Sequence, residues 1–430
     1  MSDTTYDVPK DWELRKIKSL GKFQNGFGFP ERFQGNTNEE IPFLKVSDIN
    51  NPFDVYVDSA SNYVSTKLSS TMSWSLTPIG SIIFPKIGVA LLKNHRKINI
   101  KEVIIDNNMS AFVKRENINN KYLFYIFKEL DMQNFVNISA VPSINFDLLK
   151  NFQIPITLDL KLQQQIVNYL DKKTAKIDAT IAKIEELIDL LEEKRVALIN
   201  QVVTKGLNPD VPMKDSGVEW IGEIPAHWEV TLARRFCKIE TGGTPKREVL
   251  SYWENGTVNW MTSGEVNQEY VNDTKNKITI EGLNNSNAHT LPKNSIVMAL
   301  SGQGQTKGRV AILNVPTCCS QSVGAFICDN THIHYKYLFY YFKSRYYDIR
   351  GLVGDNLRDG LSLSIIGNIP TLIPPFEEQI KIANELDKHI PKINETIGKI
   401  EENIALLEEY KTSLIHHVVT GKIDVRGEEI

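Results

Sequence analysis

This chain of 430 residues has no long apolar run, no paired cysteines and no nucleotide-binding motif. Because no stretch of about 18 apolar residues occurs, we expect no membrane span. The N-terminus lacks a basic segment followed by an apolar one, so no secretory signal is visible and a cytoplasmic location is expected. The four cysteines form no Cys-x-x-Cys pair, which favours free buried thiols in a reducing compartment over a metal site.

Catalytic signatures are missing as well. No Walker-type sequence occurs, and segment 302–308 has one residue too many for Gly-x-Gly-x-x-Gly. An adenine methyltransferase would need an Asn/Asp-Pro-Pro-Tyr/Phe loop. The partial matches at 51–53 and 374–376 lack the second proline or the preceding Asn/Asp. The adjacent His416 and His417 have no further ligands at metal spacing. These absences argue against a catalytic chain, although an enzyme with an unrecognised site stays open as an alternative.

The chain contains a long internal sequence repeat. Residues 171–204 and 387–420 align without a gap, and 20 of the 34 positions are identical. Shorter matches extend the repeat to Pro-x-x-Trp (9–12 and 225–228), Tyr-Leu-Phe-Tyr (122–125 and 337–340) and Ile-Pro (154–155 and 373–374). Their offsets vary by a few residues, which indicates small loop insertions in a common scaffold. Each repeat therefore consists of Pro-x-x-Trp, a variable module, an Ile-Pro exit and a long helix.

Apolar residues in both helical segments follow steps of three and four; in the second copy only Lys411 interrupts this seam, and Arg195 stands at the matching break of the first copy. Two apolar positions per heptad favour a coiled coil over helices that pack only on their own modules. The seam includes Ile177, Ile181, Ile184, Ile188 and Leu191 in the first copy, and Ile393, Ile397, Ile400, Ile404 and Leu407 in the second. If the modules lie at opposite ends, the helices must be antiparallel, and the C-terminus returns beside the N-terminus.

The predicted fold class is α+β: two mixed α/β globular modules separated by a long antiparallel two-helix coiled coil, with an internal pseudo-twofold repeat. The expected boundaries are module one at 1–158, first helix at 159–205, linker at 206–226, module two at 227–373, second helix at 374–422 and tail at 423–430. Within the modules, short apolar runs closed by glycine predict strands. The aromatic helices near 121–130 and 336–345 are expected to be core rather than base-stacking surfaces.

The modules are mildly basic although the net charge is −3. Residues 8–158 carry 18 basic and 14 acidic side chains, and residues 227–373 carry 15 and 12, which permits contact with phosphates. Asn, Gln and Arg can read base edges, while Lys and Thr suit phosphates. The candidate DNA-binding residues are Lys86, Lys93, Arg96, Asn108, Ser110, Thr244, Lys246, Arg247, Ser263, Gln303, Gln305, Lys307, Arg309 and Arg358. Any one alone is more often a solvated loop residue, but two related scaffolds with different polar loops suggest two different half-sites.

Taken in order and given twice, these elements resemble the specificity (S) subunit of a Type I restriction–modification system. The motifs that carry the resemblance, besides the duplicated helices, are Ile-Pro-x-x-Trp (224–228), Thr-Gly-Gly-Thr-Pro (241–245), the Ser-Gly turn (301–302), the Ile-Pro exit with its glutamine (373–379) and the linker (216–228). The resemblance covers residues 8–422. Module one departs from it at 25–30, which reads Asn-Gly-Phe-Gly-Phe-Pro.

The resemblance implies a non-catalytic targeting subunit of an adenine-N6 DNA methyltransferase or Type I restriction endonuclease complex. Each module would be a target recognition domain that reads half of a bipartite, asymmetric sequence in double-stranded DNA. The helices would set the spacer and dock two modification subunits, and restriction subunits would join the larger complex. This chain would bind no cofactor, since S-adenosylmethionine and ATP with magnesium belong to the partner subunits. The remaining alternative is a tandem protein-binding module without a DNA role.

Overall fold

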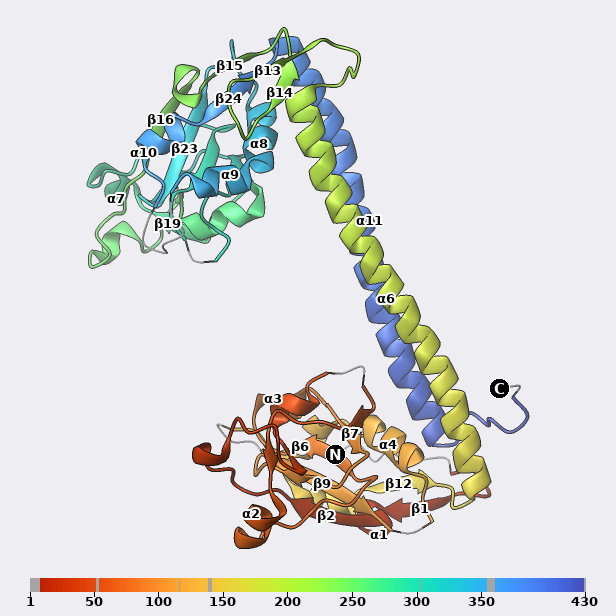
Figure 1. The fold of residues 1–430 in the computed structure, drawn as a ribbon. Helices are drawn as coiled ribbons and strands as arrows, with labels where there is room; N and C mark the ends of the chain where they lie inside the picture. Colours follow the sequence, from red (N-terminus) through yellow and green to blue (C-terminus); the bar gives the residue numbers. More distant parts are fainter. Residues whose placement is uncertain are drawn as a thin grey trace. The chain divides into compact units, whose positions relative to one another are not determined.

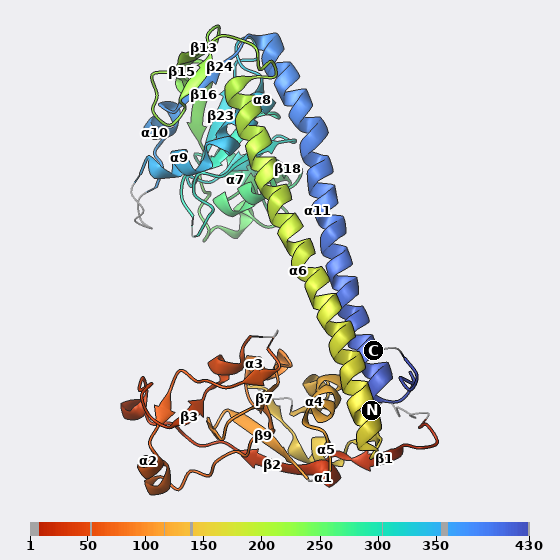
Figure 2. The same ribbon diagram turned by 45° about the vertical axis from the view of Figure 1, so that its right-hand side comes forward.

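The structure, a computed structural model, describes residues 8–51, 54–115, 117–137, 141–302, 304–353 and 360–428. The chain forms two compact units (Figures 1 and 2): unit 1 comprises Met1–Glu185 and Glu401–Ile430, and unit 2 comprises Glu186–Ile400. Each unit holds one mixed α/β domain and parts of two long helices. The predicted fold class of two mixed modules with two packed long helices in a duplicated chain is confirmed.

In unit 1, the domain is built on a five-stranded sheet in the order β2–β9–β6–β7–β4 and a smaller sheet in the order β5–β3–β8. Its strands are β1 (Glu13–Lys16), β2 (Gly21–Asn25), β3 (Ile41–Leu44), β4 (Tyr56–Val57), β5 (Tyr63–Val64), β6 (Ile82–Pro85), β7 (Lys97–Asn99), β8 (Ile104–Ile105), β9 (Met109–Lys114), β10 (Val136–Asn137), β11 (Ser143–Ile144) and β12 (Gln153–Ile156). Its short helices are α1 (Ile17–Leu20), α2 (Thr66–Thr71), α3 (Val89–Leu92), α4 (Asn120–Glu129), α5 (Phe146–Asn151), η1 (Glu31–Phe33), η2 (Val46–Ile49) and η3 (Met132–Phe135).

Unit 2 repeats this topology, with sheets in the orders β16–β23–β20–β21–β18 and β19–β17–β22. Its strands are β13 (Met213–Asp215), β14 (Glu223–Pro225), β15 (Glu229–Leu232), β16 (Cys237–Thr241), β17 (Val258–Met261), β18 (Tyr270–Val271), β19 (Asn276–Ile278), β20 (Ile296–Ala299), β21 (Val310–Leu313), β22 (Cys318–Cys319), β23 (Val323–Cys328) and β24 (Pro370–Ile373). Its short helices are α7 (Ile280–Asn284), α8 (Tyr335–Ser344), α9 (Tyr346–Gly351), α10 (Leu363–Gly367), η4 (Ala233–Arg235), η5 (Leu250–Tyr252) and η6 (Ser263–Gln268).

The aromatic helices α4 and α8 belong to the cores of their domains. Six consecutive residues of each helix are buried. The rings of Phe112 on β9 and Phe127 on α4 lie 4.9 Å apart, and those of Phe326 on β23 and Phe342 on α8 lie 4.7 Å apart. The helix therefore packs on the sheet through the same ring pair in both copies. The prediction that the aromatic stripe is core, rather than a base-stacking surface, is confirmed.

The two long helices are α6 (Leu160–Lys205) and α11 (Phe376–Val419). Along much of both helices, buried and half-buried side chains recur at two positions per heptad, the pattern of a coiled-coil seam. The ten seam candidates lie on this side: Ile177, Ile181 and Ile397 are buried, and Ile184, Ile188, Leu191, Ile393, Ile400, Ile404 and Leu407 are half-buried.

The helices run antiparallel in both units, as predicted. In unit 1 the first part of α6 packs on the last part of α11, and Lys411 Nζ donates to Asp178 Oδ1 over 2.5 Å. In unit 2 the last part of α6 packs on the first part of α11, and Arg195 donates to Asn394 Oδ1 over 2.8 Å. The two residues that interrupt the apolar seam therefore bind across to the other helix.

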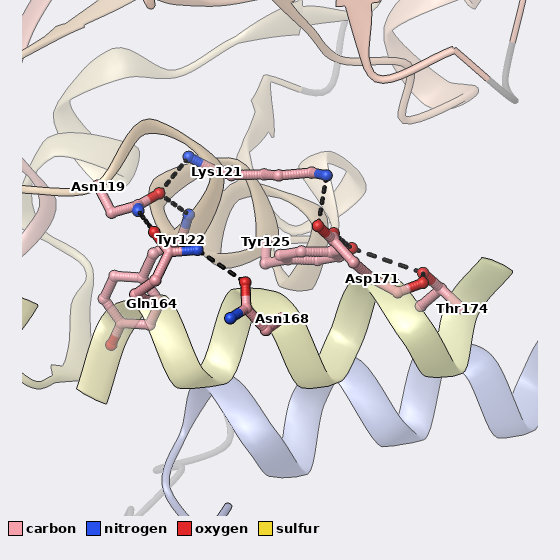
Figure 3. A network of polar contacts seen from close by, with 8 residues as sticks. All are labelled: Asn119, Lys121, Tyr122, Tyr125, Gln164, Asn168, Asp171 and Thr174. Atoms are coloured by element: carbon pink, nitrogen blue, oxygen red, sulfur yellow. Dashed lines mark hydrogen bonds and ion pairs between the residues drawn. The ribbon is translucent and has the colours of Figure 1, made fainter. Parts of the chain in front are cut away.

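Each domain is fastened to its long helix by a polar contact that Figure 3 shows for unit 1. Asp171 of α6 accepts hydrogen bonds from Tyr125 Oη and Lys121 Nζ of α4, both over 2.6 Å (Figure 3). Gln163 of α6, fully buried, accepts from the Asn119 N–H over 2.8 Å. Burial raises the pKa of Tyr125, and the bond to the Asp171 carboxylate adds to that shift, so the hydroxyl remains a donor. We call this set of contacts the clamp.

Unit 2 contains the same clamp. Asp387 of α11 accepts from Tyr340 Oη over 2.8 Å and from Lys336 Nζ over 2.5 Å. Gln379, fully buried, accepts from the His334 N–H over 2.8 Å. The hydrogen bond to Asp387 raises the pKa of Lys336, and burial raises that of Tyr340. The hydrogen bonds that attach each domain to its long helix are therefore repeated in both units, with the same carboxylate oxygens as acceptors.

The segments after the two long helices also correspond. Gly206 and Gly421 both have φ of 75°, the left-handed conformation in which glycine commonly ends a helix. After Gly206, the predicted linker forms the β13–β14 hairpin and packs into the core of unit 2. After Gly421, the tail lies against the N-terminal segment, and Arg426 donates to Asp11 over 3.1 Å. In unit 1, the tail and the N-terminal segment together correspond to the linker of unit 2. The tail and the N-terminal segment lie side by side, as expected.

Candidate nucleic-acid interface

Three loops meet at one end of the five-stranded sheet of unit 1. Asn25 ends β2, Lys86 follows β6, and Asn108 precedes β9, which lies between the other two strands. Lys86 Nζ donates to Asn25 Oδ1 over 3.0 Å, and its backbone N–H donates to the Asn108 carbonyl over 2.9 Å. Partial burial lowers the pKa of Lys86, and Asp106 opposes that shift. We call the surface formed by Asn25, Lys86 and Asn108 sheet end 1.

The corresponding end of the sheet in unit 2 carries Thr244, Ser301 and Gln321, which we call sheet end 2. The Leu300 backbone N–H donates to the turn before β23 over 2.8 Å, as Lys86 does in unit 1, so Leu300 takes the place of Lys86. The Thr244 hydroxyl donates to Gln321 Oε1 over 2.6 Å. Ser301 and Gln321 are exposed. The two sheet ends share a backbone and differ in their polar side chains.

The loop that enters each sheet end follows the same path despite its different sequence. A side chain at Gly242 would lie 1.6 Å from the Cys319 carbonyl oxygen, and one at Gly26 would lie 1.9 Å from the Asp106 carbonyl oxygen. Glycine is therefore needed at both positions for the loop to lie against the neighbouring strand. The loop of the first copy differs in sequence from Thr-Gly-Gly-Thr-Pro and therefore presents different side chains. Its glycine still lies close to the neighbouring backbone.

Nine of the predicted DNA-binding residues are accessible. They are Lys86, Lys93, Asn108, Thr244, Lys246, Arg247, Ser263, Gln305 and Arg309, all exposed or half-buried. Arg309 donates to Asn267 Oδ1 over 3.2 Å and to Gln305 Oε1 over 3.0 Å. Together with Arg195 and Lys343, it lines a cavity of about 360 Å³ beside α6 in unit 2. Glu269, which forms an ion pair with Lys343, lines the same cavity, so its basic charge is partly neutralised within the protein.

Three other predicted residues are buried. Arg96 is 2% exposed and donates to the Leu130 carbonyl over 2.5 Å, and burial lowers its pKa to about 9. The Ser110 hydroxyl donates to the Gln24 carbonyl over 2.9 Å, and Lys307 is buried as well. None of the three can reach DNA without a rearrangement. Arg96 and Ser110 use their donors to hold neighbouring backbone in place. Two further candidates, Gln303 and Arg358, lie outside the described residues.

Two exposed residues at the sheet ends were absent from the predicted set. Asn25 holds Lys86, and Gln321 accepts from Thr244. Asn25 is the last residue of β2, and Gln321 lies two residues before β23. The strand orders β2–β9–β6 and β16–β23–β20 bring their loops together, and no motif in the sequence marks that neighbourhood.

No group of three His, Cys, Asp or Glu side chains suited to a metal ion occurs within the part of the chain that the structure describes. The four cysteines are free, as predicted. Three are buried and Cys328 is half-buried. The sulfurs of Cys237 and Cys328 lie 3.7 Å apart across the β16–β23 ladder. Within the described residues, no helix is long and apolar enough to cross a membrane.

The chain belongs to the Type I restriction modification DNA specificity domain family, whose model matches residues 9–189 and 225–405. It is similar to the Type I restriction enzyme MjaVIII specificity subunit of Methanocaldococcus jannaschii, with 24% identity over 442 residues, 98% of this chain and 95% of that one. It is also similar to the Type I restriction enzyme EcoR124I/EcoR124II specificity subunit of Escherichia coli, with 26% identity over 236 residues, 53% of this chain and 52% of that one.

Two solved structures share the fold. A chain from a study of complex assembly and conformational transition of the type I R-M system has a TM-score of 0.69 at 15% identity, covering 97% of this chain and all of that one. The HsdS subunit from Thermoanaerobacter tengcongensis has a TM-score of 0.54 at 14% identity, covering 98% of this chain and all of that one. The chain is thus the DNA specificity subunit of a Type I restriction–modification complex. Such a subunit is itself non-catalytic and binds no cofactor.

Proposed function

We propose that the domain of each unit reads one half of a bipartite, asymmetric sequence in double-stranded DNA. The observation that carries this proposal is the pair of sheet ends, which share one backbone arrangement but present different side chains. Asn25 and Asn108 offer amides at sheet end 1, and Gln321 and Thr244 offer an amide and a hydroxyl at sheet end 2. These groups can read base edges, while Lys86, Lys93, Lys246 and Arg247 suit the flanking phosphates.

The paired helices α6 and α11 set the length of the unread spacer in this proposal, and they dock two modification subunits. Apolar side chains that remain exposed on both helices outside the seam support the second role. Leu187, Leu190, Val196, Leu406 and Tyr410 are between 45% and 61% exposed. The modification subunits would supply S-adenosylmethionine and the methylation chemistry. Restriction subunits with ATP and magnesium would join the larger complex, in the cytoplasm, where the target DNA is.

Co-expression with the modification subunit, followed by mapping of N6-methyladenine, tests this proposal. We expect a two-part motif with a fixed gap. Exchange of residues 227–373 for those of another specificity subunit should change one half of the motif and leave the other half and the gap unchanged. A motif that changes in both halves, or an undivided motif, would contradict the assignment of one half-site to each domain.

A further inference from the structure

Unit 1 exposes apolar side chains directly beside sheet end 1. Val89 is 70% exposed, Val141 is 55% exposed and Ile87 is 36% exposed. The two loops that carry them are joined, because the Gly88 N–H donates to the Pro142 carbonyl over 2.7 Å and Ile87 forms a bridge with the next residue. We call Ile87, Val89 and Val141 the apolar patch.

Polar and basic side chains frame this patch. Lys86 precedes it and is held by Asn25 of sheet end 1 over 3.0 Å. Lys93, exposed, follows α3, the short helix that begins with Val89. The domain as a whole carries four more basic than acidic residues between positions 8 and 158. An apolar patch with a basic frame suits a partner that is anionic at its edges and apolar at a few central points.

Among the residues that the structure describes, the loop of the second copy that corresponds to Ile87 and Val89 carries no such patch. Leu300 takes the backbone position of Lys86, so the residue that follows, Ser301, corresponds to Ile87, and both are exposed. The rest of the loop in unit 2 carries Gly302, Gln305 and other polar residues, with no exposed large apolar side chain between 300 and 309 among the described residues. The two copies therefore present different chemistry from the same place in the fold.

We propose that the apolar patch recognises thymine C5-methyl groups in the major groove of the half-site that the first domain reads. This inference rests on the proposed function and adds the chemistry of one half-site to it. The thymine methyl is the apolar group that a base pair presents in the major groove, and phosphates line both edges of that groove. The patch and its basic frame match this arrangement, whereas Ser301 at the same place in the second copy matches a base edge that forms hydrogen bonds.

Deoxyuridine tests the proposal, because it removes the methyl group of thymine and leaves base pairing unchanged. The complex with its modification subunits is given DNA in which the thymines of one half-site are replaced. Burial of one methyl group corresponds to about a fourfold change in affinity. We therefore expect binding to weaken about fourfold for each contacted methyl in the first half-site, and less than twofold for replacement in the second half-site.

The variants Ile87→Ser and Val89→Ser should lose the same factor on thymine DNA and become insensitive to deoxyuridine, because protein and DNA changes that remove one contact are not additive. Ile87→Ser also introduces the side chain that the second copy carries. Ile79→Ser is the matched control, since Ile79 is 61% exposed in the loop at the opposite end of β6. It should bind thymine and deoxyuridine DNA as the wild type does.

Three outcomes would overturn the inference. The first is equal binding of thymine and deoxyuridine DNA by the wild-type complex, and the second is a first half-site without thymine on either strand. The third is a variant that impairs assembly with the modification subunits while the deoxyuridine effect is unchanged, which would make the patch a protein contact. Failure to find any two-part motif would count instead against the proposed function.

Discussion

The two copies of the repeat agree at the clamp and disagree at the sheet ends. At the clamp, an aspartate and a glutamine of a long helix bind a tyrosine, a lysine and a backbone N–H of the domain in both units. At the sheet ends, Lys86 corresponds to Leu300, Ile87 to Ser301 and Asn108 to Ser322 at equivalent backbone positions. The contacts that attach a domain have thus been kept, while those that would read a target have diverged.

Burial explains why the two regions differ in their tolerance to change. Gln163 and Gln379 are fully buried and bonded at both ends of their amides, so a substitution would leave buried polar groups without partners. Val89, at the start of α3, and Gln321, in the turn before β23, are exposed to solvent, where substitutions cost little stability. Divergence at the sheet ends therefore needs no compensating change elsewhere.

The largest expected effect comes from lengthening both long helices together. A four-residue turn inserted at matching points of α6 and α11 adds about 6 Å, which corresponds to about two base pairs of DNA. We expect methylation mapping to show a spacer longer by about that amount and two unchanged half-sites. A seven-residue insertion, which preserves the heptad seam, should add about three base pairs. An unchanged spacer in both variants would show that the helices do not set it.

The clamp can be broken separately in each copy. Asp387→Ala leaves Tyr340 and Lys336 without their shared acceptor, and Asp171→Ala does the same to Tyr125 and Lys121. Each should destabilise its own unit by about 2 kcal/mol, because a hydrogen-bonded, partly buried charge is lost. Hydrogen exchange of the two domains in the complex would locate the loss.

Glu395→Ala is the control for the clamp variants, since it removes an exposed ion pair with Lys399 on the same helix. It should cost less than about 0.5 kcal/mol. If one aspartate variant behaved like this control while the other destabilised its domain, the two clamps would not be energetically equivalent.

Lys128 of the first copy lies in a different environment from its counterpart in the second copy. Burial and the nearby positive charges of Arg96, Lys411 and Lys97 lower its pKa to about 8. The Asp178 carboxylate opposes this shift. At pH 7 the amine is charged in the folded and the unfolded chain, so the whole cost of burying that charge is present. The cost disappears as the pH rises from about 8 towards the ordinary value of 10.5. Lys128→Met should therefore stabilise unit 1 at pH 7 by about 2 kcal/mol, and not at pH 11.

Lys343, the counterpart in the second copy, forms an ion pair with Glu269. Its charge is therefore stabilised by a carboxylate, whereas the charge of Lys128 is destabilised by burial and by nearby positive charges. Lys343→Met should leave stability unchanged or lower it slightly at pH 7. Thermal unfolding of both variants at pH 7 and pH 11 distinguishes the two environments. A Lys128→Met variant that is less stable than the wild type at pH 7 would contradict the assignment.

The smallest expected effect is that of a circular permutant. Because Arg426 contacts Asp11 and the tail lies against the N-terminal segment, the original termini can be joined and the chain opened within 206–226. We expect the permutant, in complex with its modification subunits, to methylate the same two-part motif. A folded permutant with a different motif would contradict the equivalence of the linker with the joined termini.

Sequence alone predicted the repeat, the antiparallel seam and the buried aromatic helices because each depends on spacing along the chain. It could not predict which candidate side chains reach solvent. Ser110 lies on β9 and points into the core, while Asn108, two residues earlier, lies in a turn and is exposed. The grouping of Asn25 with Lys86 required the strand order β2–β9–β6, which arises from pairing between distant segments. The hairpin in the linker is also a product of such pairing.

The position of the clamp has a consequence for how this protein can evolve. Its residues lie on α4, α8 and the long helices, or directly before α4 and α8, and none belongs to a sheet end. A domain that acquires a new loop at its sheet end keeps the tyrosine, the lysine and the N–H that attach it to the long helix. If each domain reads a half-site as proposed, a new target can arise in one genetic step while the attachment of the domain stays intact.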